Sequence, residues 1–522
     1  MLINCIRGFL EKAYKKAPTK VALKDGARSI TYEELFEKVN QVAHYLSELE
    51  LPKGSRIGIY SYKNIDQVIS ILAILSTEHI IVPISRVLKS EQVKHIIDDC
   101  KIECIITDKN KLQNIEEIEF NKTIITYEAT KKEIVSFEEI FKCCTKRYSC
   151  NINSHSNALI TYSFGVSGFP KGIVISHRNL ADSARVVSSY LELKSSDVIS
   201  GVLPFILDYG INQICCSIYK RATLAIHSML LGRDFFNHIL DDGVTIIPLM
   251  PIHITQMFEE RYIPNPKLLN GVRKITSSGG KITKKMMKDI ENSFQNAEFY
   301  SMHGLTEAFR STYLEPEQLK IRPDSIGKAI PDVEIYVVNE DGLECAPREI
   351  GELVHRGGCI YRGYWNAKDL SDKFYKSIKI LKNVVNLEGD LVDEVVVCSG
   401  DYVYKDEEGY LYFVSRKDDM IKSCGFRISP YEIERVVYDN LPSIKECAVF
   451  GIENEKIEEE IVLVYASNLE MAKNEILFEL KKHLPTHMIP SRILYKQKLP
   501  KMGSNSDKID KEVLKKEISE II

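Results

Sequence analysis

The sequence lacks the features of a zinc-binding, secreted or membrane protein. Its thirteen cysteines form no CxxC pair, and no cluster of His and Cys has the spacing of a zinc site. The most apolar stretch, residues 68–84, is interrupted by Thr77-Glu78-His79, and charged residues come too early in the N-terminal segment for a signal peptide. We therefore expect a cytoplasmic protein with free thiols and no membrane partner.

An excess of charge of one sign is also lacking. The formal net charge is -4 over 522 residues, so the chain has no surplus of positive charge with which to bind nucleic acid. The composition, 44% hydrophobic and 27% charged, is typical of a globular protein. A chain of this length exceeds one ordinary core, which predicts two or more domains.

Apolar runs alternate with amphipathic helical segments through the first four hundred residues. Residues 31–48 are predicted to form a helix that opens with a capping box, Thr31 with Glu34. A second helix is expected at 65–75, between strands at 56–60 and 81–84. Further strands are expected at 104–107, 157–162, 223–227 and 246–249. This pattern predicts an α/β fold with a large N-terminal domain of parallel or mixed sheets covered by helices.

The last hundred residues have a different pattern. Strands at 410–414, 446–450 and 461–466 alternate with helices that begin near Pro430 and Met471. This pattern predicts a small α+β domain. We expect residues 1–417 to form the large domain and residues 418–522 the small one, separated by the charged run 415–419.

A loop rich in glycine and serine follows the strand expected at 157–162. Its residues suit the binding of an anion through backbone N–H groups, hydroxyls and one ammonium group: Ser163, Gly165, Ser167, Gly168, Lys171 and Gly172. Most loops of this kind are simple turns, and the spacing of a Walker A loop is missing. The loop by itself therefore gives only a weak prediction of a phosphate site.

Together with later segments, the loop resembles the adenylate-forming superfamily of acyl-CoA synthetases, peptide-synthetase adenylation domains and luciferases. Residues 162–172 and 177–180 match the phosphate-binding signature, although Phe164 and Val166 replace the usual Ser and Thr. The other matches follow in the family's order: Gly279-Gly280, 303–308, 351–353 with 363–366, 399–401, 416–434 and 508–510. The resemblance covers nearly the whole chain and implies ATP and Mg²⁺ as cofactors.

The resemblance also implies a role for each matched residue. Lys508, Thr306 and Glu307 would be catalytic, and Glu307 would also hold the metal. Asp418 would be the hinge about which the small domain, with Lys508, rotates between two half-reactions. A carboxylate that attacks the α-phosphate brings two anions together, so such a site needs positive charge and a metal ion. The nucleotide would be held by Ser163, Gly165, Ser167, Gly168, Lys171, Gly279, Gly280, His303, Gly304, Asp401 and Arg416.

Asp208 carries the prediction of the substrate. It lies in a segment, 203–210, that resembles the one in which amino-acid-activating members place an Asp against the substrate ammonium. A buried carboxylate is costly unless a cation pairs with it, which favours an amino acid over a fatty acid. A helix-capping Asp is the alternative interpretation. By resemblance, the residues lining the substrate would be Asp208, Tyr209, Asn212, Thr276, Ser278, Met302 and Arg310, although most could also be core positions.

Residues 208–213 and 304–313 look like those of stand-alone ligases that load L-proline onto a carrier protein. The predicted reaction is amino acid plus ATP giving aminoacyl-AMP and pyrophosphate, then transfer to the phosphopantetheine thiol of a separate carrier protein. Only fourteen residues follow Lys508, so the carrier is expected in trans, with CoA as an alternative acceptor. Two other readings stay open. One is an acyl-CoA or acyl-carrier-protein ligase for a non-amino acid. The other is a catalytically silent nucleotide-binding homologue, suggested by Phe164, Val166 and Asp507.

Overall fold

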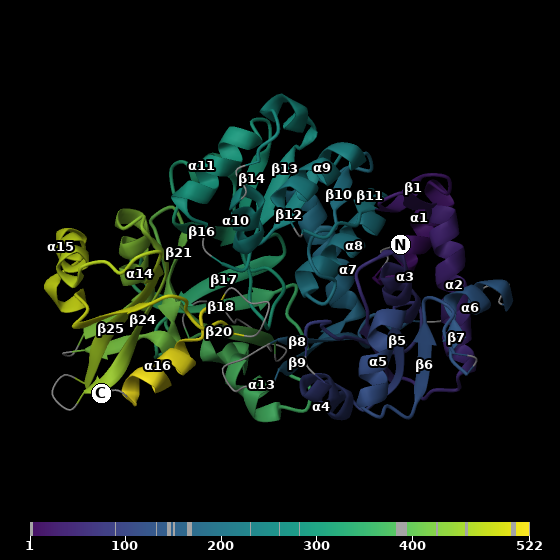
Figure 1. The fold of residues 1–522 in the computed structure, drawn as a ribbon. Helices are drawn as coiled ribbons and strands as arrows, with labels where there is room; N and C mark the ends of the chain where they lie inside the picture. The colour runs from purple at the N-terminus through teal and green to yellow at the C-terminus, as the bar shows by residue number, and fades with distance from the viewer. Residues whose placement is uncertain are drawn as a thin grey trace. The chain divides into compact units, whose positions relative to one another are not determined.

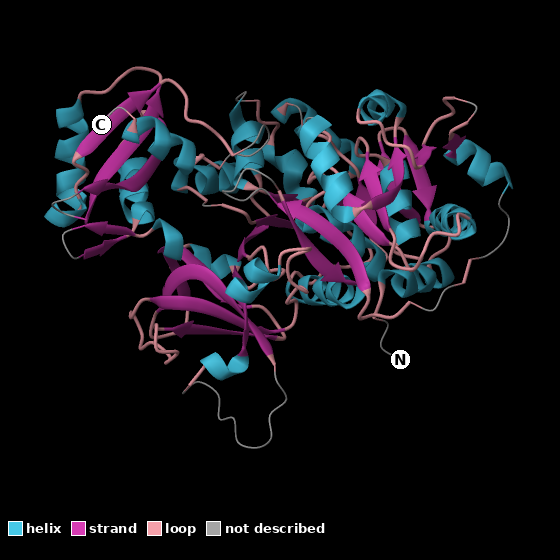
Figure 2. Ribbon diagram, turned by 90° about the horizontal axis from the view of Figure 1, so that it is seen from below, coloured by secondary structure: helices cyan, strands magenta, loops and turns pink. Residues whose placement is uncertain are grey.

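The protein is described by a computed structural model (Figures 1 and 2). It describes residues 4–88, 90–131, 133–143, 148–149, 152–163, 170–229, 231–259, 262–280, 282–382, 394–423, 426–454, 458–502 and 508–520. Contacts divide the chain into two compact units. The first comprises residues 1–321, 329–334 and 356–375, and the second comprises 322–328, 335–355 and 376–522.

The first unit contains two sheets. One has the strand order β15–β14–β13–β12–β10–β11–β1–β2. From β14 to β1 these strands are all parallel, and Leu23 of β1 pairs with Leu224 of β11. The strands are β1 (Val21–Asp25), β2 (Arg28–Thr31), β10 (Val198–Ser200), β11 (Thr223–Ala225), β12 (Ile246–Leu249), β13 (Lys274–Ser277), β14 (Glu298–His303) and β15 (Thr312–Leu314).

The other sheet has the order β7–β6–β5–β3–β4–β8–β9. Its strands are parallel except for the antiparallel pair β8–β9. They are β3 (Arg56–Tyr60), β4 (Ile80–Pro83), β5 (Ile102–Thr107), β6 (Thr123–Thr126), β7 (Val135–Ser136), β8 (Asn157–Ser163) and β9 (Lys171–Ser176). The parallel order arises because a helix follows most of these strands and returns the chain to the same edge.

Helices cover both sheets of the first unit. They are α1 (Ile6–Lys16), α2 (Tyr32–Glu48), α3 (Ile65–Ile74), α4 (Ser90–Cys100), α5 (Lys109–Glu117), α6 (Phe137–Cys143), α7 (His177–Tyr190), α8 (Asp208–Lys220), α9 (Gly232–Asp242), α10 (Pro251–Glu259), η1 (Pro266–Gly271), α11 (Lys284–Ser293), α12 (Pro316–Leu319) and α13 (Lys368–Phe374). The capping box of Thr31 and Glu34 is confirmed at the start of α2.

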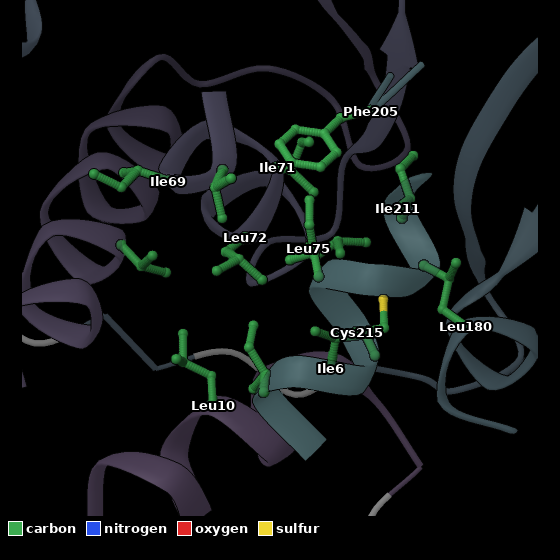
Figure 3. Packing of buried hydrophobic residues seen from close by; sticks show 14 of the residues in the cluster. Ile6, Leu10, Ile69, Ile71, Leu72, Leu75, Leu180, Phe205, Ile211 and Cys215 are labelled. Carbon is green, nitrogen blue, oxygen red and sulfur yellow. The ribbon is translucent and has the colours of Figure 1, made fainter. Parts of the chain in front are cut away.

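One buried cluster joins the two sheets. It combines side chains of α1, α2, α3, α7 and α8 with residues such as Ile57 of β3 and Ile199 of β10. Figure 3 shows this layer, with Ile6 and Leu10 of α1 facing Leu72 of α3 and Cys215 of α8. The two sheets therefore share a layer of helices, and α8 is held between them.

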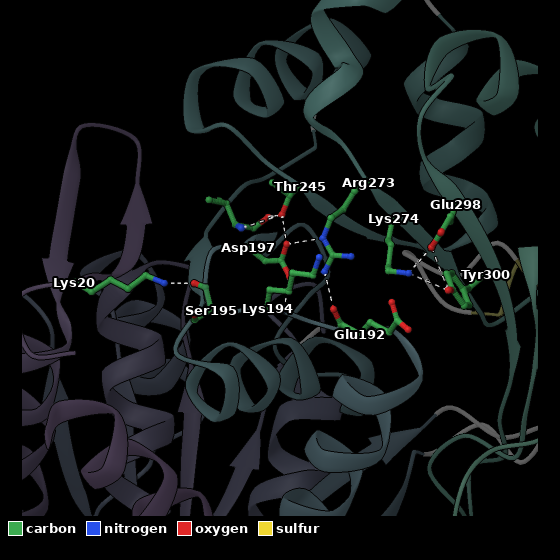
Figure 4. Close-up of polar contacts among 11 residues, drawn as sticks. Lys20, Glu192, Lys194, Ser195, Asp197, Thr245, Arg273, Lys274, Glu298 and Tyr300 are labelled. Atoms are coloured by element: carbon green, nitrogen blue, oxygen red, sulfur yellow. Dashed lines mark hydrogen bonds and ion pairs between the residues drawn. The ribbon is translucent and has the colours of Figure 1, made fainter. Parts of the chain in front are cut away.

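Ion pairs tie together the amino ends of the strands in the larger sheet (Figure 4). Arg273, just before β13, donates from Nε and Nη2 to Asp197, just before β10, at 2.7 and 2.6 Å. Thr245, just before β12, donates to the same carboxylate at 2.9 Å. This edge of the sheet is closed by structural contacts, which leaves the carboxyl edge for a ligand.

The second unit also contains two sheets. The first has the order β17–β18–β20–β21–β16, and the C-terminal sheet has the order β23–β22–β25–β24 with β26 on β25. The elements are β16 (Ser325–Ala329), β17 (Val333–Val338), β18 (Gly351–Gly357), β19 (Tyr375–Ser377), η2 (Ile378–Ile380), β20 (Val395–Lys405), β21 (Leu411–Arg416), η3 (Lys417–Asp419), β22 (Ile421–Ser423), β23 (Phe426–Ile428), α14 (Pro430–Asn440), β24 (Ile444–Asn454), β25 (Glu458–Ser467), α15 (Lys473–His483), η4 (Thr486–Met488), β26 (Arg492–Lys496) and α16 (Lys511–Ser519). Separate buried clusters cover the two faces of the C-terminal sheet.

The predicted fold class is confirmed: a large α/β region with helix-covered sheets is followed by a smaller α+β region. The strand expected at 410–414 is present as β21, which pairs with β16 and β20. The boundary at 417/418 and the hinge at Asp418, which lies in η3, stay predictions. Cys104, Cys215, Cys216 and Cys447 are buried free thiols. No helix in the described ranges is both long and apolar enough to cross a bilayer.

Candidate functional site

The predicted substrate residues of the first unit gather at the carboxyl ends of parallel strands. Thr276 lies in β13, and Ser278 follows its end with its N–H bonded to Leu249 O at 3.4 Å. Met302 and His303 end the neighbouring strand β14, and Gly304 follows it. Ligands bind at this edge of parallel sheets, so these sequence-distant motifs meet where a site is expected.

Asp208 is the first residue of α8, and its carboxylate is held at both oxygens. Oδ1 accepts the N–H of Tyr209 at 2.6 Å, and Oδ2 accepts the hydroxyl of Tyr361 at 2.9 Å. Burial and the charge of Asp208 raise the pKa of Tyr361, so its phenol stays protonated and donates. The N-cap of α8 is Leu207, and Asp208 follows it as the first residue of the helix, where its carboxylate binds a first-turn N–H. An acid in the first turn of a helix is also favoured by the helix dipole.

The segment before α8 is held by a lysine that lies far away in sequence. Nζ of Lys63 donates to the carbonyls of Gly201 and Val202 at 2.6 and 2.7 Å and to Leu203 O at 3.4 Å. Gly210 permits the close approach of this segment, because a Cβ there would lie 2.0 Å from Pro204 O. Lys63 could not be predicted as part of the site, since it lies in no motif and 145 positions before Asp208.

Five of the predicted substrate residues are buried in one region, which we call the Arg310 cluster together with the half-buried Tyr190 and the buried Tyr361: Tyr209, Asn212, Thr276, Met302 and Arg310. The Arg310 guanidinium carbon lies 4.0 Å from the centroid of the Tyr209 ring. The Tyr209 hydroxyl shares a 2.6 Å hydrogen bond with Thr276 Oγ1. The Tyr190 hydroxyl contacts Met302 Sδ at 3.0 Å.

Asn212 joins the cluster through α8, one turn after Tyr209, and its amide donates to Ser183 Oγ at 3.1 Å. Tyr190 and Tyr361 were not predicted, because neither lies in a motif that is associated with the substrate. The network combines one cation, hydroxyls and an amide, which suits a small polar ligand better than a long acyl chain.

Glu307 is 3% exposed and is oriented by two tyrosines. Its Oε1 accepts the hydroxyl of Tyr364 at 2.6 Å, and its backbone carbonyl accepts the hydroxyl of Tyr375 at 3.1 Å. Burial and the charge of Glu307 raise the pKa of Tyr375. The preceding residue, Thr306, is exposed. A buried carboxylate oriented in this way has the chemistry that Mg²⁺ prefers.

The predicted phosphate loop joins two antiparallel strands. Ser163 at the end of β8 pairs with Lys171 at the start of β9. No helix follows the loop directly, because β9 comes first and α7 begins only at His177. Gly165, Ser167 and Gly168 lie outside the described residues. Gly279 has a left-handed φ of 87°, and a Cβ on Gly280 would lie 3.2 Å from Pro251.

Three other predicted residues lie together in the second unit. Asp401 of β20 pairs with Arg416 of β21, and their side chains form an ion pair. Desolvation by the surrounding chain and the charge of Arg416 lower the pKa of Lys508, whereas the charge of Asp401 raises it. The residue nevertheless remains exposed to solvent. A carboxylate and two cations in one place suit the hydroxyls and the charge of a nucleotide.

A cluster of possible metal ligands lies elsewhere in the first unit: His227, His238 and Asp242. The two imidazoles stack with their ring centroids 4.9 Å apart and an interplanar angle of 16°. Because the rings are nearly parallel, their nitrogen lone pairs lie in separate planes and do not point at one common metal position. Asp242 also pairs with Lys24 at 3.4 Å. We interpret this cluster as structural.

Comparisons with known proteins identify relatives of nearly the whole chain. The model of the AMP-binding enzyme family matches residues 10–365, and that of the AMP-binding enzyme C-terminal domain matches residues 432–505. Tyrocidine synthase 1 of Brevibacillus parabrevis is 26% identical over 521 residues, which is 98% of this chain and 44% of that protein. The chain therefore spans less than half the length of that relative.

Two solved structures share the fold. ATP-bound MatB from Rhodopseudomonas palustris has a TM-score of 0.85 at 20% identity and covers 99% of each chain. O-succinylbenzoate coenzyme A synthetase (MenE) from Bacillus subtilis, in complex with ATP and magnesium ion, has a TM-score of 0.80 at 21% identity. It covers 94% of this chain and 96% of its own.

Proposed function

The chain belongs to the family of AMP-binding enzymes, and on this basis we propose that it is an AMP-forming ligase that activates an amino acid. The reaction joins the amino acid to ATP, giving an aminoacyl-adenylate and pyrophosphate. L-Proline is the first candidate substrate. The aminoacyl group then passes to the phosphopantetheine thiol of a separate carrier protein, with CoA as the alternative acceptor.

The proposal that the substrate is an amino acid rests on the position of Asp208. Its carboxylate lies at the start of α8, beside the carboxyl edge of the larger sheet, with Oδ2 bonded to Tyr361 at 2.9 Å. A substrate ammonium would neutralise this charge where a fatty acid would leave it unpaired. The matched relatives that are named tyrocidine synthase and surfactin synthase support the same choice.

ATP and Mg²⁺ are the proposed cofactors. Glu307 would hold Mg²⁺, which supplies charge neutralisation at the phosphates when bound. Thr306, His303, Gly304, Gly279 and Gly280 would contact the nucleotide from the first unit, together with the loop from Ser163 to Lys171. In the second unit, Asp401 would accept the ribose hydroxyls, Arg416 would donate to ribose or phosphate, and Lys508 would stabilise the developing charge of adenylation.

The test is ATP–pyrophosphate exchange, screened across the amino acids and a set of fatty and aryl acids. Exchange with L-proline and no other acid supports the full proposal. Exchange with a different amino acid supports activation but rejects proline. Exchange only with acids that lack an amine rejects amino acid activation in favour of an acyl ligase. No exchange with any acid supports a catalytically silent homologue.

The role of Asp208 is tested with a matched variant. Asp208 is half-buried. Asp208→Ala should raise KM for the amino acid at least about 10-fold, because the charge pair with the substrate ammonium is lost. Asp234, an exposed acid in the first turn of α9, offers the control Asp234→Ala, which should leave the exchange rate unchanged. An Asp208→Ala enzyme with the KM of the wild type would refute the assignment.

A further inference from the structure

The charge of Arg310 is unpaired within the described part of the chain. The residue is 5% exposed, and its Nε and Nη2 atoms are buried without a hydrogen-bond partner there. Its contacts include the face and hydroxyl of Tyr209 and the ring of Phe309, none of which carries a negative charge. A guanidinium group cannot lose its proton at any ordinary pH, so burial cannot be relieved by neutralisation.

The groups around Arg310 do not supply the missing charge. Those that interact with it electrostatically are neutral in their ordinary state: Tyr190, Tyr209, Cys216 and Tyr361. A buried cation without an anion is strongly unfavourable, so such an arrangement is expected where a ligand completes the pair.

The backbone conformation also fixes the position of Arg310. The residue has a left-handed φ of 42°, which an L-residue adopts only at a cost. It lies against Gly304, where a Cβ would come within 3.2 Å of Arg310 N and 3.3 Å of Nη1. The guanidinium group is therefore directed beneath the turn that follows β14 and toward Tyr209.

Asp208 and Arg310 both interact with the side chain of Tyr361. Asp208 accepts the hydroxyl of Tyr361, and Arg310 is close enough to Tyr361 to oppose the effect of Asp208 on its pKa. A negative and a positive group thus flank one tyrosine. This is the charge pattern that is complementary to a zwitterion.

We propose that Arg310 binds a carboxylate of the substrate through its Nε and Nη2 atoms. These two donors form a fork that matches the two oxygens of a carboxylate. The inference rests on the proposed function, since it assumes that the substrate is an amino acid. The carboxylate is either the one that is adenylated or a second one on an acidic side chain, and the chemistry at Arg310 is the same in both cases.

The experiment compares Arg310→Met with the wild type by isothermal titration calorimetry and pyrophosphate exchange. The ligands are L-proline, L-aspartate, L-glutamate and L-prolinol, an amine without a carboxylate. Roughly 100-fold weaker binding of L-proline in Arg310→Met supports contact with the carboxylate that is adenylated. The same loss confined to aspartate or glutamate supports a second carboxylate. Arg310→Lys should recover only part of the affinity, because an ammonium group has no fork.

A second measurement separates binding from structure. In the absence of ligand, Arg310→Met should melt at the same temperature as the wild type or higher, because the variant removes an unpaired buried charge. A lower melting temperature with unchanged ligand affinity would overturn the proposal. Arg233→Met, at an exposed position in α9, is the control for loss of charge. If no acid supports exchange, the proposed function fails, yet the calorimetry still decides whether Arg310 binds carboxylates.

Discussion

At the scale of single residues, Glu307 shows how a carboxylate is positioned by groups outside its own motif. Tyr364 bonds to the carboxylate oxygen, whereas Tyr375 bonds to the backbone carbonyl of the same residue. The two tyrosines therefore fix different parts of Glu307. Groups that orient a metal ligand influence metal affinity strongly.

Tyr364→Phe is expected to weaken the use of Mg²⁺. Without the phenolic hydroxyl, the carboxylate loses the bond that sets its orientation. The Mg²⁺ concentration for half-maximal pyrophosphate exchange should rise roughly 10-fold to 100-fold, and saturating Mg²⁺ should restore much of the rate. Titration of Mg²⁺ at fixed ATP and amino acid measures this change.

Tyr375→Phe is the matched control for that titration. It removes a hydroxyl that binds the backbone of Glu307 and not its carboxylate, so the Mg²⁺ requirement should stay at the wild-type value. An equal rise in both variants would mean that loss of local packing, and not orientation of the carboxylate, is responsible.

The sequence predicted the charged residues of the site better than their partners. Glu307 and Asp208 were identified from their motifs, but Tyr361 and Tyr364 were not assigned to them. These tyrosines reach Glu307 and Asp208 because Ala308 pairs with Ile360 across more than fifty positions of sequence. Such a contact depends on the fold and leaves no periodic signal in the chain.

At the scale of elements, the entry into α8 depends on a single lysine. Lys63 lies between β3 and α3, beside the other sheet, and binds three successive carbonyls of the segment that precedes Asp208. The position of the proposed substrate carboxylate is thus set by an element distant in sequence.

Lys63→Met should impair substrate binding without removing any proposed contact to the substrate. The three carbonyls lose their donor, and the segment before Asp208 becomes less well fixed. We expect KM for the amino acid to rise about tenfold, since small displacements of positioned groups are costly. Steady-state exchange kinetics measure the effect, and an unchanged KM would contradict this role of Lys63.

The same variant should alter the pH dependence of stability. Burial, with the charge of Arg86, lowers the pKa of Lys63 to about 7 from its ordinary value of 10.5. Between these values the unfolded chain binds the proton and the folded chain does not, so the wild type gains stability relative to Lys63→Met as pH rises from 7 to 10. The slope of the difference in unfolding free energy approaches about 1.4 kcal/mol per pH unit. Urea unfolding at pH 7, 8.5 and 10 tests the sign.

The elements were largely predictable from local patterns, whereas their pairing was not. The helix after Thr31 and the strand at Arg56–Tyr60 follow from a capping box and a short apolar run. The strand expected at 410–414 was found, but the alternation of residues predicts that a strand exists and not which strand it pairs with. That neighbour is set by contacts with β16 and β20, far away in sequence.

At the scale of the whole molecule, the predicted residues are divided between the two compact units. Asp208, Glu307 and Arg310 belong to the first, whereas Asp401, Arg416 and Lys508 belong to the second. The proposal assigns Lys508 to adenylation alone, and it retains the hinge at Asp418 as a further prediction.

Lys508→Ala should therefore separate the two half-reactions. Pyrophosphate exchange should fall roughly 10²-fold to 10³-fold, because a positioned cation is lost from the transition state. Transfer of a supplied aminoacyl-adenylate to the carrier thiol, or to CoA, should continue at close to the wild-type rate. Single-turnover assays of each step measure the two effects.

Lys516→Ala, at an exposed position of α16, is the control and should affect neither step. Equal loss of both steps in Lys508→Ala would reject the assignment of Lys508. Retention of both steps would mean that another residue of the chain supplies the catalytic cation.

The pairing of β1 with β11 has a consequence for how the protein is made. Leu23 meets Leu224 in the finished sheet, so β1 leaves the ribosome about two hundred residues before its parallel partner exists. At typical synthesis rates this interval is roughly 10 to 40 s. During that time the strand pair β1–β2 exposes an apolar edge that only later parts of the chain can cover. Ala22 and Leu23, which are buried in the finished sheet, therefore gain their full cover only after residue 225 has been synthesised.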